Sequence, residues 1–206
     1  MILPAKSTTK AYTAECQMIL SHNNEYAVVL DACVLVPMPL CDTLLHLAEE
    51  PSFYRPLWSG KILQEVGDAL ENKLGLNERQ RSRRLKVMQE AFPEALIVIP
   101  PRLEETFECP DEDDRHVIAC AVKGQANAII TLNQRHFPPE CLDEYGILCQ
   151  HPDEFLVHQF YLAPQVVVEK LDVQAAAIGK KRSDTIKRLE NVVPNFCRLL
   201  NKYFPL

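Results

Sequence analysis

The sequence predicts an α/β protein in which a parallel sheet is flanked by helices and followed by a C-terminal helical extension. Three short apolar runs rich in branched side chains, residues 26–31, 96–99 and 128–131, have the length and composition of buried parallel strands. The segments between them carry apolar residues at helical spacing, so strands and helices alternate. After Pro152 the pattern is helical only.

The chain divides into three parts by pattern. Residues 1–24 are polar and weakly patterned, and we interpret them as an N-terminal arm. The α/β pattern covers residues 25–150, which we expect to form the main domain. Residues 151–206 form the predicted helical extension.

Local signals set the expected helix boundaries. The first helix follows Ser59, a residue type that caps helix N-termini, and the second runs from about Asn77 to Ala91. A third begins near Asp114, because an acidic residue suits the positive end of a helix. In the extension the expected boundaries are Pro164, Ser183 and Pro194.

Composition fits a globular protein of one domain with an extra element. Of the 206 residues, 47% are hydrophobic and 24% charged. No run approaches the roughly 20 apolar residues of a membrane span, and the N-terminus lacks an apolar signal core, so we expect a cytoplasmic protein without membrane contact. The eight cysteines include no CxxC pair, and we expect buried free thiols in preference to disulfides or zinc ligands.

The net charge of −6 is unevenly distributed. Residues 1–164 hold 24 acidic against 14 basic side chains, a net −10, whereas residues 165–206 hold 4 against 8, a net +4. An acidic body attracts phosphates poorly unless metal ions or local basic surfaces intervene. Composition alone therefore argues against a general nucleic-acid binder.

Several polar residues fall where an α/β sheet binds ligands. Asp31 ends the first predicted strand and Asn133 follows the last one, so both belong at the carboxyl edge of the sheet, where ligands bind. Glu65 lies beside the apolar stripe of its helix instead of on the solvated face. The alternative for Glu65 is a buried stem with its head group in water.

Residues 104–114 contain seven acids, and most of them suit a solvated loop. Asp114 differs because it lies three residues before Val117, on the buried side of its helix, and should point toward Asp31. Three converging carboxylates repel one another unless a cation lies among them. Ligation by oxygen alone favours Mg²⁺ or Mn²⁺ over zinc, and such ions support phosphodiester hydrolysis.

Four segments, VVLDACVL, ILQEVGDAL, DEDDRHVIACAV and TLNQRHFP, resemble in order and spacing the four motif blocks of PIN domains, particularly the VapC-like group. The resemblance covers about residues 25–150. It implies a PIN-like parallel sheet flanked by helices. It also implies a metal-dependent endoribonuclease, often the toxin of a type II toxin–antitoxin pair.

Carried over by motif, the resemblance implies that Asp31, Glu65 and Asp114 are the catalytic, metal-binding acids, with Asp111 or Asp113 as helpers. The implied cofactor is Mg²⁺ or Mn²⁺. The implied partners are an RNA substrate and a cognate antitoxin protein.

The fourth block departs from the family pattern. Asn133 stands at the fourth metal-ligand position and His136 just before the Phe, where many relatives have an aspartate. An amide ligates a metal without adding charge, which leaves the occupancy of a second metal open. His136 has three readings: phosphate binding, proton transfer, or packing against the turn that follows it. The departure also permits a catalytically weak module that binds RNA or a partner protein.

The predicted RNA-binding residues begin with a basic run on the second helix, whose alternative is an ordinary solvated helix. The set comprises Arg81, Arg83, Arg84, Arg115, Thr131 and His136. The apolar stripe of the last helices suits packing on the domain, pairing of two protomers in a homodimer, or capture of an antitoxin segment.

Overall fold

The computed structural model describes residues 25–205, so the predicted arm over residues 1–24 lies outside the described residues. The chain forms two compact units. The sheet unit consists of residues 26–41 and 55–152. Within the described chain, the helical unit consists of Glu25 with residues 42–54 and 153–205.

The sheet unit is built on five parallel strands in the order β3-β2-β1-β4-β5. The strands predicted over residues 26–31, 96–99 and 128–131 are confirmed as β1, β3 and β4, each with shorter bounds. Asp31 and Thr131 therefore directly follow their strands. The strands are β1 (Ala27–Leu30), β2 (Arg55–Ser59), β3 (Leu96–Ile97), β4 (Ala128–Ile130) and β5 (Leu148–Gln150).

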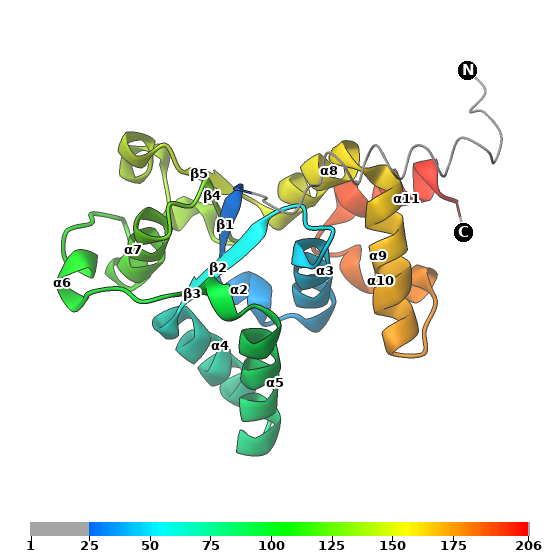
Figure 1. The fold of residues 1–206 in the computed structure, drawn as a ribbon, viewed down its shortest axis with the longest axis horizontal. Coiled ribbons are helices and arrows are strands. Elements are labelled where there is room, and N and C mark those ends of the chain that lie inside the picture. Colours follow the sequence, from blue (N-terminus) through cyan, green and yellow to red (C-terminus); the bar gives the residue numbers. More distant parts are fainter. Residues whose placement is uncertain (1–24, 206) are drawn as a thin grey trace. The chain divides into compact units, whose positions relative to one another are not determined.

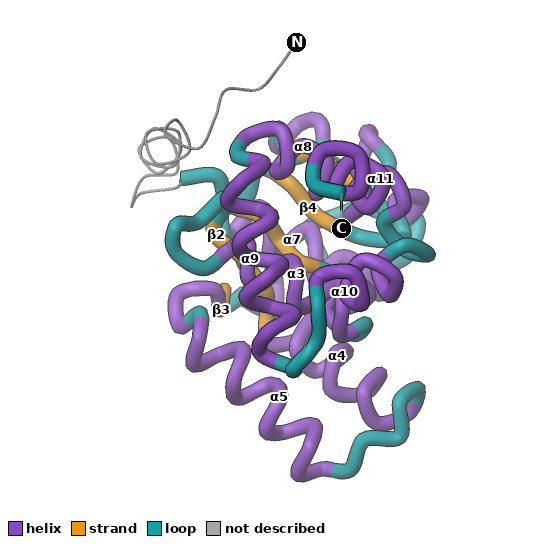
Figure 2. The backbone as a smooth tube through the Cα atoms, turned by 90° about the vertical axis from the view of Figure 1, so that its right-hand side faces the viewer, coloured by secondary structure: helices purple, strands orange, loops and turns teal. Residues whose placement is uncertain are grey.

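The three predicted helices of the main domain are present. Ser59 caps α4 by accepting from the backbone N–H of Ile62, and Asn77 caps α5 in a reciprocal pair with Gln80. Figures 1 and 2 show α4 and α5 side by side. The bounds are α2 (Ala32–Leu35), α3 (Met38–Ala48), α4 (Gly60–Asn72), α5 (Glu78–Ala91), α6 (Pro101–Glu104) and α7 (Arg115–Lys123).

The core of the sheet unit lies around the central strands. Every residue of β1 and β4 is fully buried, which explains their near-continuous apolar sequences. Helix α7 packs against β1, β2 and β4, and α4 packs against β2 and α7. This packing fixes the segment before α7 and the start of α4 relative to β1 and β4, the strands that Asp31 and Thr131 follow.

The helical unit contains the predicted C-terminal helices. Asp153, itself buried, caps α11 by accepting from the backbone N–H groups of Asn195 and Phe196. The half-buried Lys170 ammonium donates to the carbonyls of His46 and Glu49 near the end of α3. The helices are α8 (Pro152–Leu162), α9 (Pro164–Ala177), α10 (Arg182–Leu189) and α11 (Pro194–Tyr203).

The cysteines that the structure describes are free thiols, as predicted, although only Cys41, Cys120 and Cys197 are buried. Within residues 25–205, each helix is too short or too polar to traverse a membrane.

Candidate metal centre at the carboxyl edge of the sheet

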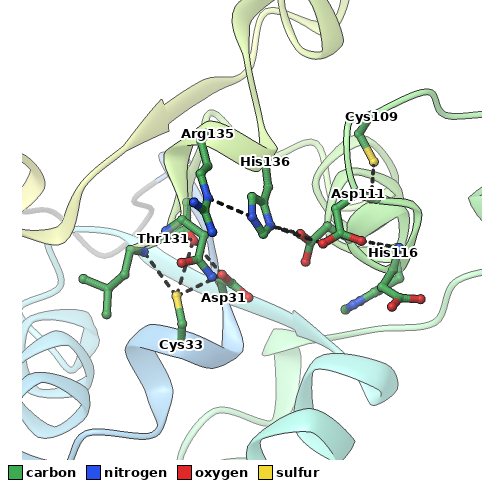
Figure 3. A network of polar contacts seen from close by, with 12 residues as sticks. Asp31, Cys33, Cys109, Asp111, His116, Thr131, Arg135 and His136 are labelled. Carbon is green, nitrogen blue, oxygen red and sulfur yellow. Dashed lines mark hydrogen bonds and ion pairs between the residues drawn. The ribbon is translucent and has the colours of Figure 1, made fainter.

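Asp31 lies just beyond β1, with its backbone N–H still bonded to the carbonyl of Ile130 at 3.1 Å. The residue is 5% exposed. Its Oδ2 accepts hydrogen bonds from Thr131 Oγ1 at 2.6 Å and from Cys33 Sγ at 3.0 Å (Figure 3). Asp31 Oδ1 has no hydrogen-bond partner among the described residues, so one oxygen is held and the other is available.

Cys33 acts as a donor to this carboxylate. Burial and the negative charge of Asp31 raise the pKa of the Cys33 thiol to about 12, so the thiol keeps its proton. The sulfur in turn accepts from the backbone N–H of Leu132 at 3.1 Å. The contact between Leu132 and Cys33 was not predicted from the sequence, because it depends on the turn after β4 folding back over the start of α2.

A second group of ligands lies between α7 and the turn after β4. His136 Nδ1 is 2.6 Å from Asp114 Oδ2 and 3.6 Å from Asp111 Oδ2. One ligand atom of each of these three residues lies within 4.8 Å of the other two. On the far side of the ring, Arg135 Nε donates to His136 Nε2 at 3.2 Å (Figure 3). Because Nε2 accepts, the ring proton is on Nδ1 and is donated to Asp114.

Burial raises the pKa of Asp114 above the usual aspartate value. The hydrogen bond from His136 lowers this pKa, whereas the charges of Asp31 and Asp111 raise it further. The charge of Asp31 thus acts on the carboxyl of Asp114, although the two residues are distant in the sequence. The carboxylates of Asp111 and Asp114 have oxygens within 4.8 Å of one another. Such a pair fits a divalent cation, which would offset the repulsion between the two charges.

Glu65 projects from α4 and is held by a residue that the sequence analysis did not single out. Its Oε1 lies 2.8 Å from His116 Nε2. His116 is 0% exposed, whereas the Glu65 side chain is 36% exposed. A histidine two residues after Asp114 within an apolar helix face was the sequence signal for this pair.

Two predicted metal ligands lie at the margin of the site. Asp113 is exposed, and its backbone N–H donates to Asp111 Oδ1 at 3.1 Å. Asn133 is also exposed, and its backbone N–H donates to Thr131 Oγ1 at 3.0 Å. The group of acids and histidine within 4.8 Å of one another contains Asp111, Asp114 and His136, and does not contain Asp31, Glu65 or Asp113.

The predicted RNA-binding arginines of α5 differ in their surroundings. Arg81 pairs with Glu71 at 3.0 Å and also with Glu78. Arg84 Nη2 donates to the carbonyls of Leu35 at 2.6 Å and Val36 at 3.0 Å, at the end of α2. Arg83 is exposed and has no partner within the described chain.

The remaining predicted RNA contacts also have internal partners. Arg115 pairs with Glu112 at 3.0 Å, and Thr131 is 0% exposed, with its hydroxyl directed to Asp31. His136 is bonded on both ring nitrogens.

Comparison with known proteins adds two findings. The family model described as "PIN domain" matches residues 27–135. A protein of Mycobacterium tuberculosis named "Putative ribonuclease VapC50" is 34% identical over 96 residues, a match that covers 45% of this chain and 56% of the relative. The chain thus spans about half the length of that relative. No solved structure matches the chain.

Proposed function

This chain belongs to the PIN domain family, and from that premise we propose that it is a metal-dependent endoribonuclease, the toxin of a type II toxin–antitoxin pair. The observation that carries the proposal is the position of the acids: Asp31 directly follows β1, and Asp111 and Asp114 lie beside His136 in the turn after β4. Like charges at a ligand-binding edge of the sheet favour a cation site. The relative from Mycobacterium tuberculosis, whose name is "Putative ribonuclease VapC50", supports the same activity.

The residues proposed to hold the ion are Asp31, Glu65 and Asp114, with Asp111 as a helper. His136 lies next to Asp114 and donates a hydrogen bond to it. Bound there, Mg²⁺ or Mn²⁺ would activate a water and neutralise charge on the phosphate oxygens of RNA. Asp113 and the neutral Asn133 are exposed, and we assign them to a second, weaker ion.

The chain's own residues prepare the acids for this task. The Thr131 hydroxyl and the Cys33 thiol both donate to Asp31 Oδ2, which fixes the carboxylate and leaves Oδ1 for a cation. We therefore assign Thr131 to orienting Asp31 instead of contacting RNA. Of the three α5 arginines predicted to bind RNA, Arg83 is best placed to meet a phosphate, because it is exposed and unpaired within the described residues.

The first test is Asp31→Asn, compared with Asp143→Asn on an exposed turn as the matched control. We expect Asp31→Asn to reduce Mn²⁺-dependent cleavage of a labelled RNA pool to the level seen with a chelator, because it removes a ligand charge. Circular dichroism should show an intact fold. Asp143→Asn should cleave like the wild type.

Two results would contradict this proposal in different ways. Full cleavage by folded Asp31→Asn would remove Asp31 from the mechanism. RNA binding by the wild type without any metal-dependent cleavage would favour a module that binds RNA without cutting it, the alternative that the neutral Asn133 permits.

A further inference from the structure

His116 is a buried histidine with one nitrogen bonded and one not. Its Nε2 lies 2.8 Å from Glu65 Oε1, and its Nδ1 is buried with no hydrogen-bond partner in the part of the chain that the structure describes. A carboxylate can only accept, so Nε2 donates the proton of this bond. Nδ1 is then unsatisfied whether or not it carries a proton.

An imidazole is an unfavourable choice for this position if packing is its only role. The next three residues of α7, Val117, Ile118 and Ala119, are fully buried and apolar. An apolar side chain at position 116 would pack there without leaving a buried nitrogen that lacks a hydrogen-bond partner. Such a nitrogen costs free energy of folding. The identity of residue 116 is therefore explained by the bond to Glu65.

The bond joins two parts of the proposed metal centre. Glu65 belongs to α4, and His116 lies two residues after Asp114 at the start of α7. These helices contact one another. A glutamate that is 36% exposed would otherwise sample several rotamers, whereas the bond fixes Oε1 and leaves Oε2 without a partner among the described residues.

We propose that His116 is a positioning residue of the metal centre, which holds Glu65 ready to ligate a divalent cation and fixes it relative to Asp114. The inference rests on the proposed function. Hydrogen bonds from outer residues orient ligating carboxylates in metal sites, and their loss typically weakens metal affinity.

A matched pair of amides separates this role from simple packing. The amide nitrogen of glutamine reaches the place of the imidazole Nε2, whereas that of asparagine lies at the place of Nδ1. We expect His116→Asn to weaken Mn²⁺ binding by roughly 10–100-fold, the range typical for such partners. We expect His116→Gln to retain most of the affinity. Calorimetric titration of the full chain with Mn²⁺ alone measures both.

His116→Leu provides the control for folding. It removes the buried Nδ1 that has no hydrogen-bond partner and keeps the position apolar, so the melting temperature should not fall. Mn²⁺ binding should nevertheless weaken as in His116→Asn. A purely structural role predicts the opposite pattern, a lower melting temperature with unchanged metal affinity.

The outcomes also separate this inference from the proposed function. If the wild type binds Mn²⁺ and the Asn and Leu variants bind it equally well, the inference is overturned and the proposed function stands. If the wild type binds no Mn²⁺, the metal-dependent function itself is overturned. Independently of metal, ¹⁵N NMR of the imidazole should show a proton on Nε2, and a ring protonated only on Nδ1 would refute the bond.

Discussion

Asp114 is the acid at which the electrostatics of the site can be tested without RNA. Its pKa is raised in the folded protein by burial, against the bond from His136 and together with the charges of Asp31 and Asp111. An acid with a higher pKa when folded binds its proton more tightly in the native state. Its ionisation therefore lowers stability as pH rises from the ordinary aspartate range, and the full penalty is present at neutral pH.

We therefore expect Asp114→Asn to raise the free energy of unfolding at neutral pH in the presence of a chelator. The asparagine oxygen can still accept from His136, so the change removes mainly the charge. The gain should shrink as pH falls below about 4, the ordinary aspartate range. Urea denaturation at both pH values measures it, with exposed Asp113→Asn as the control. A less stable Asp114→Asn protein at neutral pH would contradict the argument.

The positions of the acids in the fold were easier to predict from the sequence than the residues that contact them. Asp31 and Asp114 follow from two local rules, the end of a buried strand and the buried side of a helix start. The contact of Thr131 with Asp31 joins residues 100 positions apart, and the contact of His136 with Asp114 joins residues 22 positions apart, in each case through an irregular turn. Periodicity carries no signal in such turns, so these contacts could not be predicted.

Helices and strands were predicted correctly where the sequence signal that defines them is local. Ser59 and Asn77 each begin a helix through a bond to a residue three positions on. Strand β2 was missed because it contains Pro56, which cannot donate to a ladder and normally argues against a central strand. Strand β5 was missed because its three residues are defined only by pairing with β4.

Helix α5 shows why a basic run is not automatically a phosphate surface. We expect Arg84→Ala to destabilise the protein by about 1.5–3 kcal/mol, because it removes charged hydrogen bonds to the end of α2. Its RNA affinity should keep the wild-type salt dependence. Arg83→Ala should change stability by less than about 0.5 kcal/mol.

Arg83→Ala should instead reduce the slope of log affinity against log salt by about 0.7, the value for one phosphate contact on a single strand. Urea denaturation and fluorescence anisotropy over a salt series measure the two quantities. An unchanged slope for Arg83→Ala would make α5 an ordinary solvated helix.

The two units of the molecule are interleaved along the chain. Residues 42–54 belong to the helical unit although they precede β2. Their partners there are distant in sequence: Thr43 Oγ1 donates to Gln174 Oε1 at 3.0 Å, and Lys170 donates to the carbonyl of His46. A division by pattern at residue 150 cannot detect such an assignment, because the pairing residues are more than 100 positions apart.

The division into units predicts which part of the chain is stabilised when a metal ion binds. All acids of the proposed centre lie in the sheet unit, and a ligand that binds only the folded form stabilises the structure that holds it.

At a free Mn²⁺ concentration 100 times its dissociation constant, amides of β1, α4 and α7 should gain up to about 2.7 kcal/mol of protection against exchange. Amides of α9 and α11 should gain less, because their local opening leaves the site intact. Hydrogen–deuterium exchange with and without Mn²⁺ measures this, and Asp31→Asn should abolish the gain. An equal gain in both units would show that they open only together, and a gain confined to α9 and α11 would place the ion outside the sheet unit.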